Sequence, residues 1–596
     1  MGVETTEAVP AEQGAADRPV AEVLDTGSLF AQLPPDTQAR VEAAATPVRL
    51  PADQWLFRQG DEGDAFYVVR SGRVEVVVEH ATGPEVINVL RTGAALGELS
   101  LLTHQPRAAS VRAVRDTELL RLDAGRFAEL MGEAAFSMAL TRTLAALLQR
   151  GTAAAAPSRR GGVLGVVPVH PGLPVDGLVT ELTTSLGPPG RVATLWGREI
   201  DVRGDPEEAL SAYGRLLDRL EVEHDHVLLV AGPGDVPEGW DNFCRRQADR
   251  AIALAWADLA PTGDVAATVG GADLALLTRA AGPPDVERWF GAATPGRHHI
   301  VPTGGGFADA VRRMGRRLTG TSLGVVLSGG GARGLAHIGV LEVLLEAGVA
   351  VDRIGGCSMG AFVGALFALG RTPAEMVEVC KAELVARNPF NDYTIPRVSL
   401  IRAHKAEAML RRVFGTARIE QLPIDYFSVS AEMLQAQVVV HRRGPVAEAV
   451  GGSMSIPGLV PPVRGSGQLL VDGGVLNNLP IDIMAGNGEG PVVAVDVMGR
   501  KVEASGIRPA PTGIRRLRVR RRQTEELALP NILETLSRVT VLGSWRTAAE
   551  NRQHAAAIVT PELGGIGLFE FGRIDAAVEA GRRAAREALP TLAALA

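Results

Sequence analysis

Three short runs of residues in the C-terminal half carry the residue types of a serine hydrolase. Gly329-Gly330-Gly331-Ala332-Arg333-Gly334 comes first, Gly356-Cys357-Ser358-Met359-Gly360 follows about 25 residues later, and Asp472-Gly473-Gly474 stands much further along. Glycine-rich backbone offers N–H groups that can stabilise a developing oxyanion. A serine between glycines suits the sharp turn of a nucleophile, and a carboxylate beside glycines can approach it as a base. We therefore expect Ser358 to be the nucleophile and Asp472 the base.

The elements expected around the first two runs would position these groups. Leu323–Leu327 has the character of a buried strand and leads into the glycine run, and a helix should begin by about Leu335. A short strand is expected over Val351–Ile354, then the serine turn, then a helix over Ala361–Leu369. Strand, turn and helix form the context that Gly-x-Ser-x-Gly requires. Met359 then contributes an N–H beside the nucleophile.

The glycine run has a second interpretation as a dinucleotide-binding loop. Gly329, Gly331 and Gly334 match Gly-x-Gly-x-x-Gly, and Asp352 stands near the position of the acidic residue that such a fold requires. An oxidoreductase is therefore an alternative. A phosphate-binding loop is excluded because the run is not followed by lysine.

A triad with histidine is the alternative to a serine–aspartate pair. In α/β-hydrolase order, acid and then histidine follow the serine, and only His554 follows Asp472. His554 lies in a helical stretch far from any strand end, so we expect it at the surface. His337, on the helix after the glycine run, should pack or hydrogen-bond. A partly desolvated carboxylate is a competent base without imidazole.

Longer stretches around these runs carry a family resemblance. The three runs resemble those of patatin-like phospholipases, and Arg333–Gly339, Ser453–Gly458 and Asp472–Pro480 resemble the neuropathy-target-esterase-like lysophospholipases. The resemblance covers about residues 321–500 and implies a Ser–Asp dyad of Ser358 and Asp472. It implies hydrolysis of fatty acyl esters of lysophospholipids or phospholipids, with no cofactor required for catalysis. Cys357 stands where members of this family often have a threonine, directly before the serine. With Met359, the oxyanion site so implied comprises Gly329, Gly330, Gly331, Ala332, Arg333, Gly334 and Met359.

A second constellation lies near the N-terminus. From Ser28 to about Leu122, short alternating segments separated by turns predict a β-roll or barrel, and a helical stretch is expected over Ala124–Gln149. Glu98 and Arg107 flank a short helical turn, where a carboxylate can accept from a sugar hydroxyl and a guanidinium can bind phosphate.

This constellation resembles the phosphate-binding cassette of cyclic-nucleotide-binding domains. The resemblance implies Glu98 on the ribose hydroxyl and Arg107 on the cyclic phosphate, and Ala108 favours cAMP over cGMP as a regulator. The implied site comprises Gly97, Glu98, Leu99, Ser100, Arg107, Ala108 and Ser110. The alternative is a domain kept only for packing. A related alternative for the whole chain is a cyclic-nucleotide-binding scaffold protein with an inactive esterase domain.

The chain is long enough for several domains, since it has 596 residues. We expect a multidomain fold: an N-terminal β-roll, an α/β middle domain and an α/β patatin-like catalytic domain. The predicted boundaries are a disordered tail over 1–25, the cyclic-nucleotide-binding-like domain over 26–150, a linker over 151–162, an α/β domain without an assigned role over 163–320, and the esterase domain with a C-terminal extension over 321–596. His298-His299 lacks a third ligand, so no metal site is expected.

Composition restricts the partners and the compartment. The net charge of −7 gives no global basic field, so no nucleic-acid partner is expected. There is no apolar run of about 18 residues, and the N-terminus lacks the apolar core of a signal peptide. Three cysteines fit a reducing compartment. We expect a cytoplasmic protein, peripheral at the inner membrane face, that meets lipid through the basic run Arg515–Arg522 and an apolar entrance at Leu459–Val463.

Overall fold

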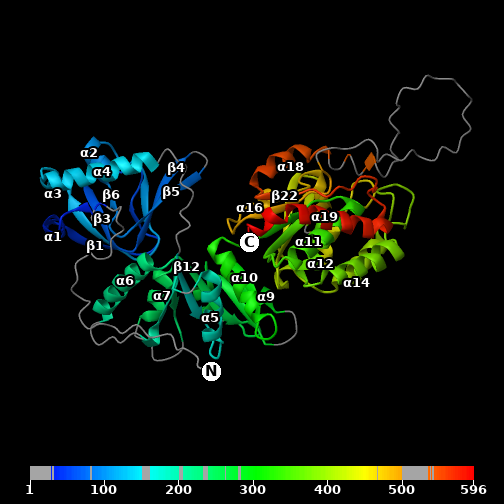
Figure 1. The fold of residues 1–596 in the computed structure, drawn as a ribbon, viewed down its shortest axis with the longest axis horizontal. Helices are drawn as coiled ribbons and strands as arrows, with labels where there is room; N and C mark the ends of the chain where they lie inside the picture. Colours follow the sequence, from blue (N-terminus) through cyan, green and yellow to red (C-terminus); the bar gives the residue numbers. More distant parts are fainter. Residues whose placement is uncertain are drawn as a thin grey trace, which may run out of the picture. The chain divides into compact units, whose positions relative to one another are not determined.

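The computed structural model in Figure 1 describes residues 29, 32–80, 83–150, 162–188, 190–199, 206–232, 239–261, 263–279, 284–465, 467–499, 535, 536, 539 and 542–595. The chain forms two compact units. The first comprises Met1–Ala255, Pro261–Ala275 and Ala292–His298, and the second comprises Trp256–Ala260, Leu276–Gly291 and His299–Ala596. The tail predicted over 1–25, nearly all of the linker and the basic run Arg515–Arg522 lie outside the described residues.

The predicted β-roll is confirmed as two four-stranded sheets. One has the order β1 (Thr46–Leu50), β8 (Thr117–Asp123), β3 (Ala65–Ser71), β6 (Ala95–Leu96), and the other β2 (Trp55–Phe57), β7 (Ser110–Ala113), β4 (Arg73–His80), β5 (Gly83–Arg91). Side chains alternate between two cores, as the period of a strand requires. On β3, Phe66 and Val68 enter one core, while Tyr67 and Val69 enter the other.

The helical stretch predicted over Ala124–Gln149 is present, with one interruption. The structure has two helices, α3 (Ala124–Met131) and α4 (Ala134–Arg150), which follow α1 (Pro35–Ala44) and α2 (Glu98–Thr103). The first ends at Gly132, whose N–H donates to the carbonyl groups of Glu129 and Leu130. The break lets Phe127 on α3 and Phe136 on α4 both pack against Phe66 of the roll.

The middle region is an α/β layer, as predicted. Its sheet has the order β10 (Val192–Trp196), β11 (His226–Val230), β9 (Val163–Pro168), β12 (Arg250–Trp256), β13 (Asp273–Thr278), β14 (Arg297–Pro302). The first four of these strands are parallel. Its helices are α5 (Val175–Leu186), α6 (Pro206–Glu223), α7 (Trp240–Gln247), α8 (Gly263–Val269), α9 (Val286–Ala292) and α10 (Phe307–Thr319). The sequence does not predict β14, because its arginine and two histidines hide the strand character.

A buried ionic cluster joins the roll to α6 within the first unit. Arg115 is 1% exposed and pairs with Glu221 and, at 3.4 Å, with Asp218. Arg73 of β4 also pairs with Glu221. Burial raises the pKa of the Asp218 carboxyl to about 7 even though the guanidinium of Arg115 opposes this shift. Removing one member of such a cluster strands an uncompensated charge, so the cluster fixes α6 on the roll.

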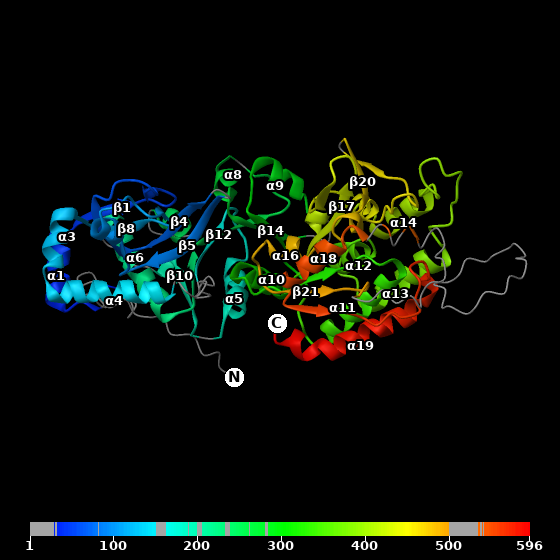
Figure 2. The same cartoon turned by 90° about the horizontal axis from the view of Figure 1, so that it is seen from above.

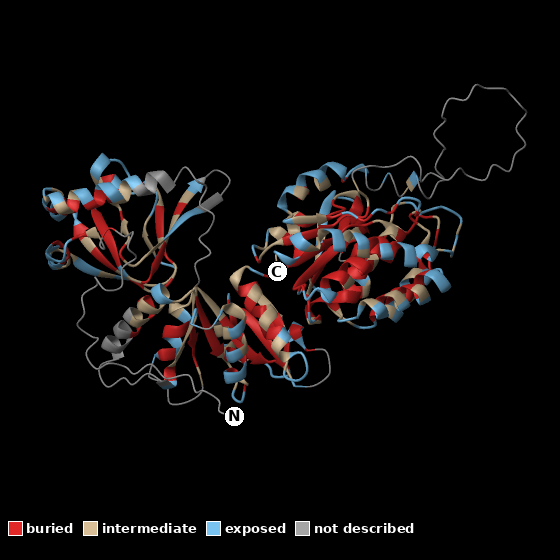
Figure 3. Cartoon of the chain, viewed as in Figure 1, coloured by how far each residue is buried: buried red, intermediate tan, exposed pale blue. Residues whose placement is uncertain are grey.

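The C-terminal sheet is mixed and carries the runs singled out in the sequence. Its order is β19 (Val463–Gly465), β20 (Gln468–Asp472), β17 (Asp425–Glu432), β16 (Arg353–Cys357), β15 (Gly324–Leu327), β21 (Val492–Val495), β22 (Ala557–Val559), and β18 (Gln437–His441) pairs with β17. Strands β17, β16, β15, β21 and β22 run parallel. Figure 3 shows these strands as the buried centre of the second unit.

Helices cover both faces of this sheet (Figure 2). They are α11 (Ala336–Glu346), α12 (Met359–Ala368), α13 (Pro373–Cys380), α14 (His404–Phe414), α15 (Val446–Ser453), α16 (Ile481–Ala485), α18 (Trp545–Asn551) and α19 (Ile574–Ala593). Val325 and Leu327 of β15 enter the core with α11, α12 and α19, and Val326 enters the core with α16. None of the helices in the described ranges has the length and apolar character needed to cross a membrane.

Candidate active site

Adjacent parallel strands bring the glycine run and Ser358 to one edge of the sheet. β15 pairs with β16 in parallel register, with Leu327 opposite Gly356. The carboxyl ends of parallel strands share an edge, where ligands of α/β sheets bind. A Cβ placed on Gly329 would lie 3.1 Å from the Cβ of Ser358. The glycine run therefore passes directly beside the serine.

Ser358 occupies a strained turn between β16 and α12. Its backbone has φ 53° and ψ −120°, a conformation that residues other than glycine rarely adopt. The strand predicted over Val351–Ile354 instead runs over Arg353–Cys357, and the helix begins at Met359. A Cβ at Gly360 would lie 2.3 Å from the carbonyl oxygen of Leu327, so only glycine allows the turn to approach β15 this closely. Strain of this kind is typical of a nucleophile elbow.

The register along β17 brings Asp472 to the serine. Residues 428 and 429 of β17 pair with both β16 and β18, whereas 430–432 pair with both β18 and β20. Because β18 holds one edge throughout, β16 and β20 lie end to end along the other edge. Cys357 closes β16 opposite Val429, and Asp472 closes β20 opposite Ser430. The two chain ends meet at this point, and the Ser358 hydroxyl donates a 2.7 Å hydrogen bond to Asp472 Oδ2.

The carboxylate of Asp472 is buried among donors. It is 3% exposed, and its Oδ1 accepts from the Gly474 N–H at 2.8 Å and from the Cys357 thiol at 3.6 Å. Burial raises the pKa of this carboxyl to about 6, while the hydrogen bond from Ser358 and the other two bonds oppose the rise. Asp472 is thus mostly ionised at neutral pH yet basic enough to take a proton.

One short segment holds both members of the pair. The Ser358 N–H donates to Ser453 Oγ at 2.8 Å, and the Ser453 hydroxyl donates to the Val429 carbonyl at 2.6 Å. Two residues further on, the Ser455 carbonyl accepts from the Asp472 N–H at 2.8 Å. In the sequence, Ser453 and Ser455 stand out only through the family resemblance, which does not indicate that they hold Ser358 and Asp472. No sequence signal short of a known serine elbow could have found it.

Some N–H groups of the glycine run donate to backbone carbonyls, and others are not used in this way within the described ranges. Gly329, Ala332 and Arg333 donate their N–H groups to carbonyls of Asn478, Leu568 and Gly330, respectively. The Arg333 guanidinium donates to the Ile566 carbonyl at 2.8 Å. Among the backbone hydrogen bonds of the described ranges, none uses the N–H of Gly330 or Gly331 as donor. Gly334 packs against the Met359 side chain. Gly330 and Gly331 are therefore the members of the predicted set best placed to face an oxyanion.

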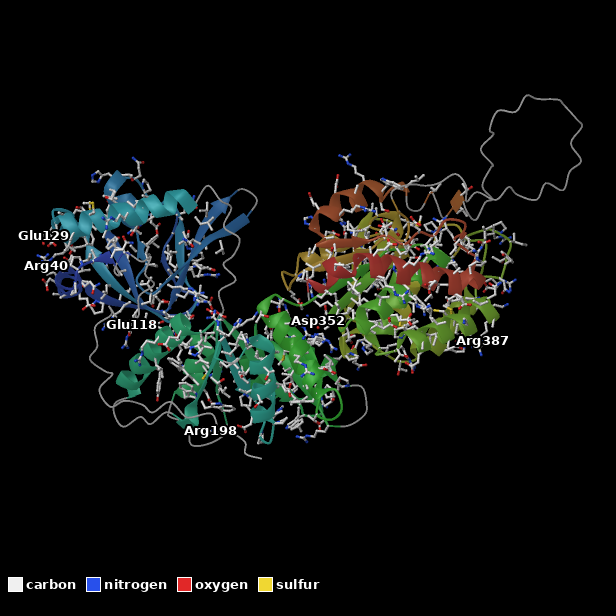
Figure 4. The ribbon with its side chains drawn as sticks, in the orientation of Figure 1. Arg40, Glu118, Glu129, Arg198, Asp352 and Arg387 are labelled. Atoms are coloured by element: carbon white, nitrogen blue, oxygen red, sulfur yellow. The ribbon has the colours of Figure 1, made fainter. Side chains whose placement is uncertain are left out.

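Histidines do not contact this pair in the part of the chain that the structure describes. His337 is fully buried, its Nε2 lies 2.9 Å from the Ser328 carbonyl, and burial lowers its pKa to about 4. His554 is exposed on a short turn, Arg552–His554. Asp352 is 1% exposed and bound by the Arg316 guanidinium at 2.7 and 2.9 Å, so the acid needed for a dinucleotide loop is already occupied (Figure 4).

The predicted apolar entrance lies inside the molecule. Leu459 and Val460 are 3% and 7% exposed and form a small core with Ile401 and Ala403. The entrance predicted at Leu459–Val463 is therefore wrong for these two side chains, because a neighbouring loop covers them.

The cyclic-nucleotide residues converge around Arg107 in the roll. Its guanidinium donates to the Gly97 carbonyl, Ser100 Oγ and the Ala65 carbonyl at 2.9–3.1 Å, and to the largely exposed Asp64 at 3.2 Å. A Cβ on Gly97, whose φ is +86°, would lie 2.5 Å from the same guanidinium. Four residues, Gly97, Ser100, Ala65 and Asp64, thus contact one buried cation.

Glu98 lies beside this cation with an unused oxygen. The side chain is 7% exposed, its Oε2 has no hydrogen-bond partner in the described part of the chain, and burial raises its pKa. Of the other predicted residues, Leu99 is 50% exposed, Ala108 is exposed, and Ser110 Oγ accepts from the Gln59 N–H at 2.8 Å. The structure gathers Gly97, Glu98, Ser100 and Arg107, and it leaves these three outside that contact set.

Comparison with known families matches two regions of the chain. Residues 325–485 match the family described as patatin-like phospholipase, and residues 47–134 match the cyclic nucleotide-binding domain. The first region contains both Ser358 and Asp472, and the second contains both Glu98 and Arg107. Each matched region thus includes one of the two constellations.

Three relatives extend the similarity over most of the chain. An uncharacterised NTE family protein of Mycobacterium tuberculosis is 36% identical, covering 92% of this chain and 93% of its own length. The human patatin-like phospholipase domain-containing protein 6 is 30% identical, covering 75% of this chain and 37% of that protein. A lysophospholipase nte1 of Aspergillus fumigatus is 27% identical, covering 95% of this chain and 43% of that protein. The chain therefore belongs to the NTE family: it is a lipid ester hydrolase with a patatin-like phospholipase domain that follows a cyclic nucleotide-binding domain.

Proposed function

We propose that the chain hydrolyses fatty acyl esters of lysophospholipids or phospholipids through a Ser358–Asp472 dyad. The observation that carries the proposal is the 2.7 Å hydrogen bond from the Ser358 hydroxyl to a buried carboxylate. A serine needs a base within about 2.6–3.2 Å, and Asp472 is the titratable group at that distance. The name lysophospholipase of the fungal relative supports a lysophospholipid substrate.

The geometry supports a two-step reaction. Ser358 Oγ attacks the acyl carbonyl while its proton moves to Asp472, and the tetrahedral oxygen lies against the N–H groups of Gly330, Gly331 and Met359. Collapse of this intermediate breaks the ester bond, and the leaving alkoxide takes the proton from Asp472. Water then attacks the acyl-serine while Asp472 accepts its proton. The acyl–Oγ bond breaks, the proton passes from Asp472 to Ser358 Oγ, and the fatty acid leaves. Removal of one oxyanion donor typically costs about 2.7–4 kcal/mol of barrier.

Labelling and product analysis test this assignment. A fluorophosphonate probe should label the wild-type chain and should fail to label Ser358→Ala. Fatty acid released from a panel of lysophospholipids and phospholipids should be lost in Ser358→Ala and Asp472→Ala, while circular dichroism stays unchanged. Residual turnover of either variant near the wild-type rate would refute the dyad. Failure of the probe on the wild type would favour a scaffold with an inactive esterase domain.

We also propose that the roll binds a cyclic nucleotide and thereby modulates the esterase. Glu98 Oε2 is a buried acceptor that a ribose hydroxyl can satisfy, and a phosphate oxygen can replace the exposed Asp64 carboxylate on Arg107. The absence of a hydroxyl at Ala108 favours cAMP over cGMP. The ionic cluster of Arg115, Asp218 and Glu221 supports modulation, because it fixes α6 to the roll.

Calorimetry with cAMP and cGMP measures the binding directly. We expect tighter binding of cAMP, a loss of at least tenfold in Glu98→Gln, and abolished binding in Arg107→Ala, with turnover measured in the same samples. Leu102→Ala, at an exposed apolar position of the same helix outside the implied site, serves as the matched control. Unchanged affinity in Glu98→Gln would contradict the assigned ribose contact, and equal turnover with and without saturating cAMP would contradict modulation.

A further inference from the structure

An ordered hairpin projects from the second unit before α14. Tyr393 and Ile401 form an antiparallel bridge, the Thr394 N–H donates to the Leu400 carbonyl, and the Arg402 N–H donates to the Asp392 carbonyl, both at 3.0 Å. The tip is fixed as well, because the Arg397 N–H donates to the Ile395 carbonyl at 2.8 Å. Residues 392–402, called the hairpin below, therefore hold a defined shape.

The tip of the hairpin presents apolar side chains to solvent. Ile395 is 80% exposed, Val398 is 70% exposed and Tyr393 is 63% exposed. Figure 3 shows exposed chain in this part of the second unit. Single exposed apolar residues are ordinary, but three on one ordered projection mark a contact site for protein or membrane.

The base of the hairpin rests on the segment that holds the catalytic pair. The Leu400 and Ile401 N–H groups donate to the carbonyls of Gly458 and Leu459 at 2.9 and 3.1 Å. Gly458 follows Ser455 by three residues, so the two lie within about 11 Å of each other along even a fully extended chain. The Ser455 carbonyl in turn accepts from Asp472. The exposed tip is thus attached to the rim of the active site.

The charge of the hairpin selects among partners. Arg397 and Arg402 are exposed on it, Lys405 follows at the start of α14, and Asp392 is the one acidic residue over 391–405. Arg387, labelled in Figure 4, lies just before the hairpin but is paired with Glu383, so the exposed charge of the hairpin comes from its own arginines. Apolar tips flanked by cations suit a layer of anionic headgroups above acyl chains. A twofold contact with a second copy would instead bring like charges together.

We propose that the hairpin inserts Ile395, Val398 and Tyr393 into an anionic lipid surface and so places the active site at the membrane. The proposal rests on the proposed lipid-ester hydrolysis and assigns its docking surface. Arg397 and Arg402 contact headgroup phosphates while the apolar tip enters the acyl boundary. The substrate then reaches Ser358 from the layer on which the enzyme rests.

Vesicle sedimentation with the full chain tests the hairpin. The double variant Ile395→Ser/Val398→Ser is compared with Met138→Ser, which replaces a 57% exposed apolar residue of α4 in the first unit. Vesicles contain phosphatidylcholine alone or with anionic phosphatidylserine. We expect the wild type and Met138→Ser to bind anionic vesicles, with about tenfold weaker partitioning for the double variant. Arg397→Gln should weaken binding to anionic vesicles and leave binding to neutral vesicles unchanged.

A water-soluble short-chain ester, assayed on the same samples, separates the two proposals. We expect the double variant to hydrolyse this ester at the wild-type rate and to lose activity on vesicle lipid in proportion to its binding. Equal vesicle binding by wild type and double variant overturns the hairpin proposal while the esterase stands. If the wild-type chain binds vesicles through the hairpin but hydrolyses no ester, the docking proposal stands and the proposed esterase activity is refuted. Loss of a dimer in the double variant, without a change in vesicle binding, assigns the tip to a second copy and overturns the proposal.

Discussion

The backbone N–H of Ser358 donates to the hydroxyl oxygen of Ser453 at 2.8 Å. Since Ser453 also donates to the Val429 carbonyl, it bridges the strained turn to the centre of the sheet. A residue at positive φ persists only where its surroundings hold it. We therefore expect Ser453 to act as a positioning residue that keeps Ser358, the proposed nucleophile, in line with Asp472.

Ser453→Ala should lower kcat about tenfold while KM stays within twofold. The substitution leaves the Ser358 N–H buried without an acceptor, at a cost of about 1–3 kcal/mol, and the turn can relax away from the carboxylate. Steady-state kinetics on a soluble ester measures both constants. Ser455→Ala is the matched control, because it removes a hydroxyl that bonds Gly451 but keeps the carbonyl that accepts from Asp472. A wild-type kcat in Ser453→Ala would show that the turn is held by packing alone.

Activity should rise with pH through a single ionisation near pH 6. Asp472 acts as a base only when ionised, and burial raises its pKa to about 6, so kcat/KM should fall about tenfold per pH unit below that value. The profile should reach its plateau by about pH 7.5. His554→Ala should reproduce the whole curve, since that histidine is exposed. A profile shifted or flattened by His554→Ala would indicate a triad instead.

Asp472→Asn should inactivate the enzyme and stabilise the second unit at alkaline pH. The folded pKa is raised from 3.8 to about 6, so the buried carboxylate is stable in its protonated form below pH 4 and that stability is lost as pH rises through 6. A difference of two pKa units corresponds to about 3 kcal/mol in the free energy of unfolding. Asparagine does not ionise, so the variant does not lose this stability. Thermal melts from pH 4 to pH 8 should show the gain of the variant growing with pH. A constant difference across this range would mean that burial does not set the pKa.

Cys357 should lower the pKa of the Asp472 carboxyl, which is the proposed base. Its thiol donates to Asp472 Oδ1 and thereby favours the ionised carboxylate. Cys357→Ala removes this donor, so the pKa of Asp472 and the acid limb of the pH profile should move upward. Cys357→Ser keeps a donor and should hold the limb at or below its wild-type position. Identical profiles for the two variants would show that the 3.6 Å contact has no electrostatic effect.

Residue types and local spacing predict most of the elements that carry the site. The buried strand at Leu323–Leu327 and the helix after Ser358 appear within about two residues of their expected bounds. Continuous apolar runs and glycine turns are local signals, and they fix such elements without tertiary information. The pattern over Ala124–Gln149 does not reveal the break between α3 and α4, because a short interruption at Gly132 leaves the apolar spacing nearly intact.

Contacts that depend on strand register could not be predicted from the sequence. The end-to-end meeting of β16 and β20 is created by β17, which the sequence did not predict at all. Ser453 acquires its role only because α15 ends beside that meeting point. Likewise, Glu98 and Arg107 were found as a pair, but their neighbours Asp64 and Ala65 lie just before and at the start of β3. Long-range pairing of this kind is invisible to local periodicity.

All three cysteines of the chain are fully buried, and burial raises the pKa of each thiol. Alkylating reagents attack thiolates, so the native protein should resist them and react only when a region opens. Cys244 reports on the first unit, whereas Cys357 and Cys380 report on the second. Mass spectrometry of pulse-alkylated peptides can therefore follow the melting of each unit separately, using probes that the natural sequence already contains.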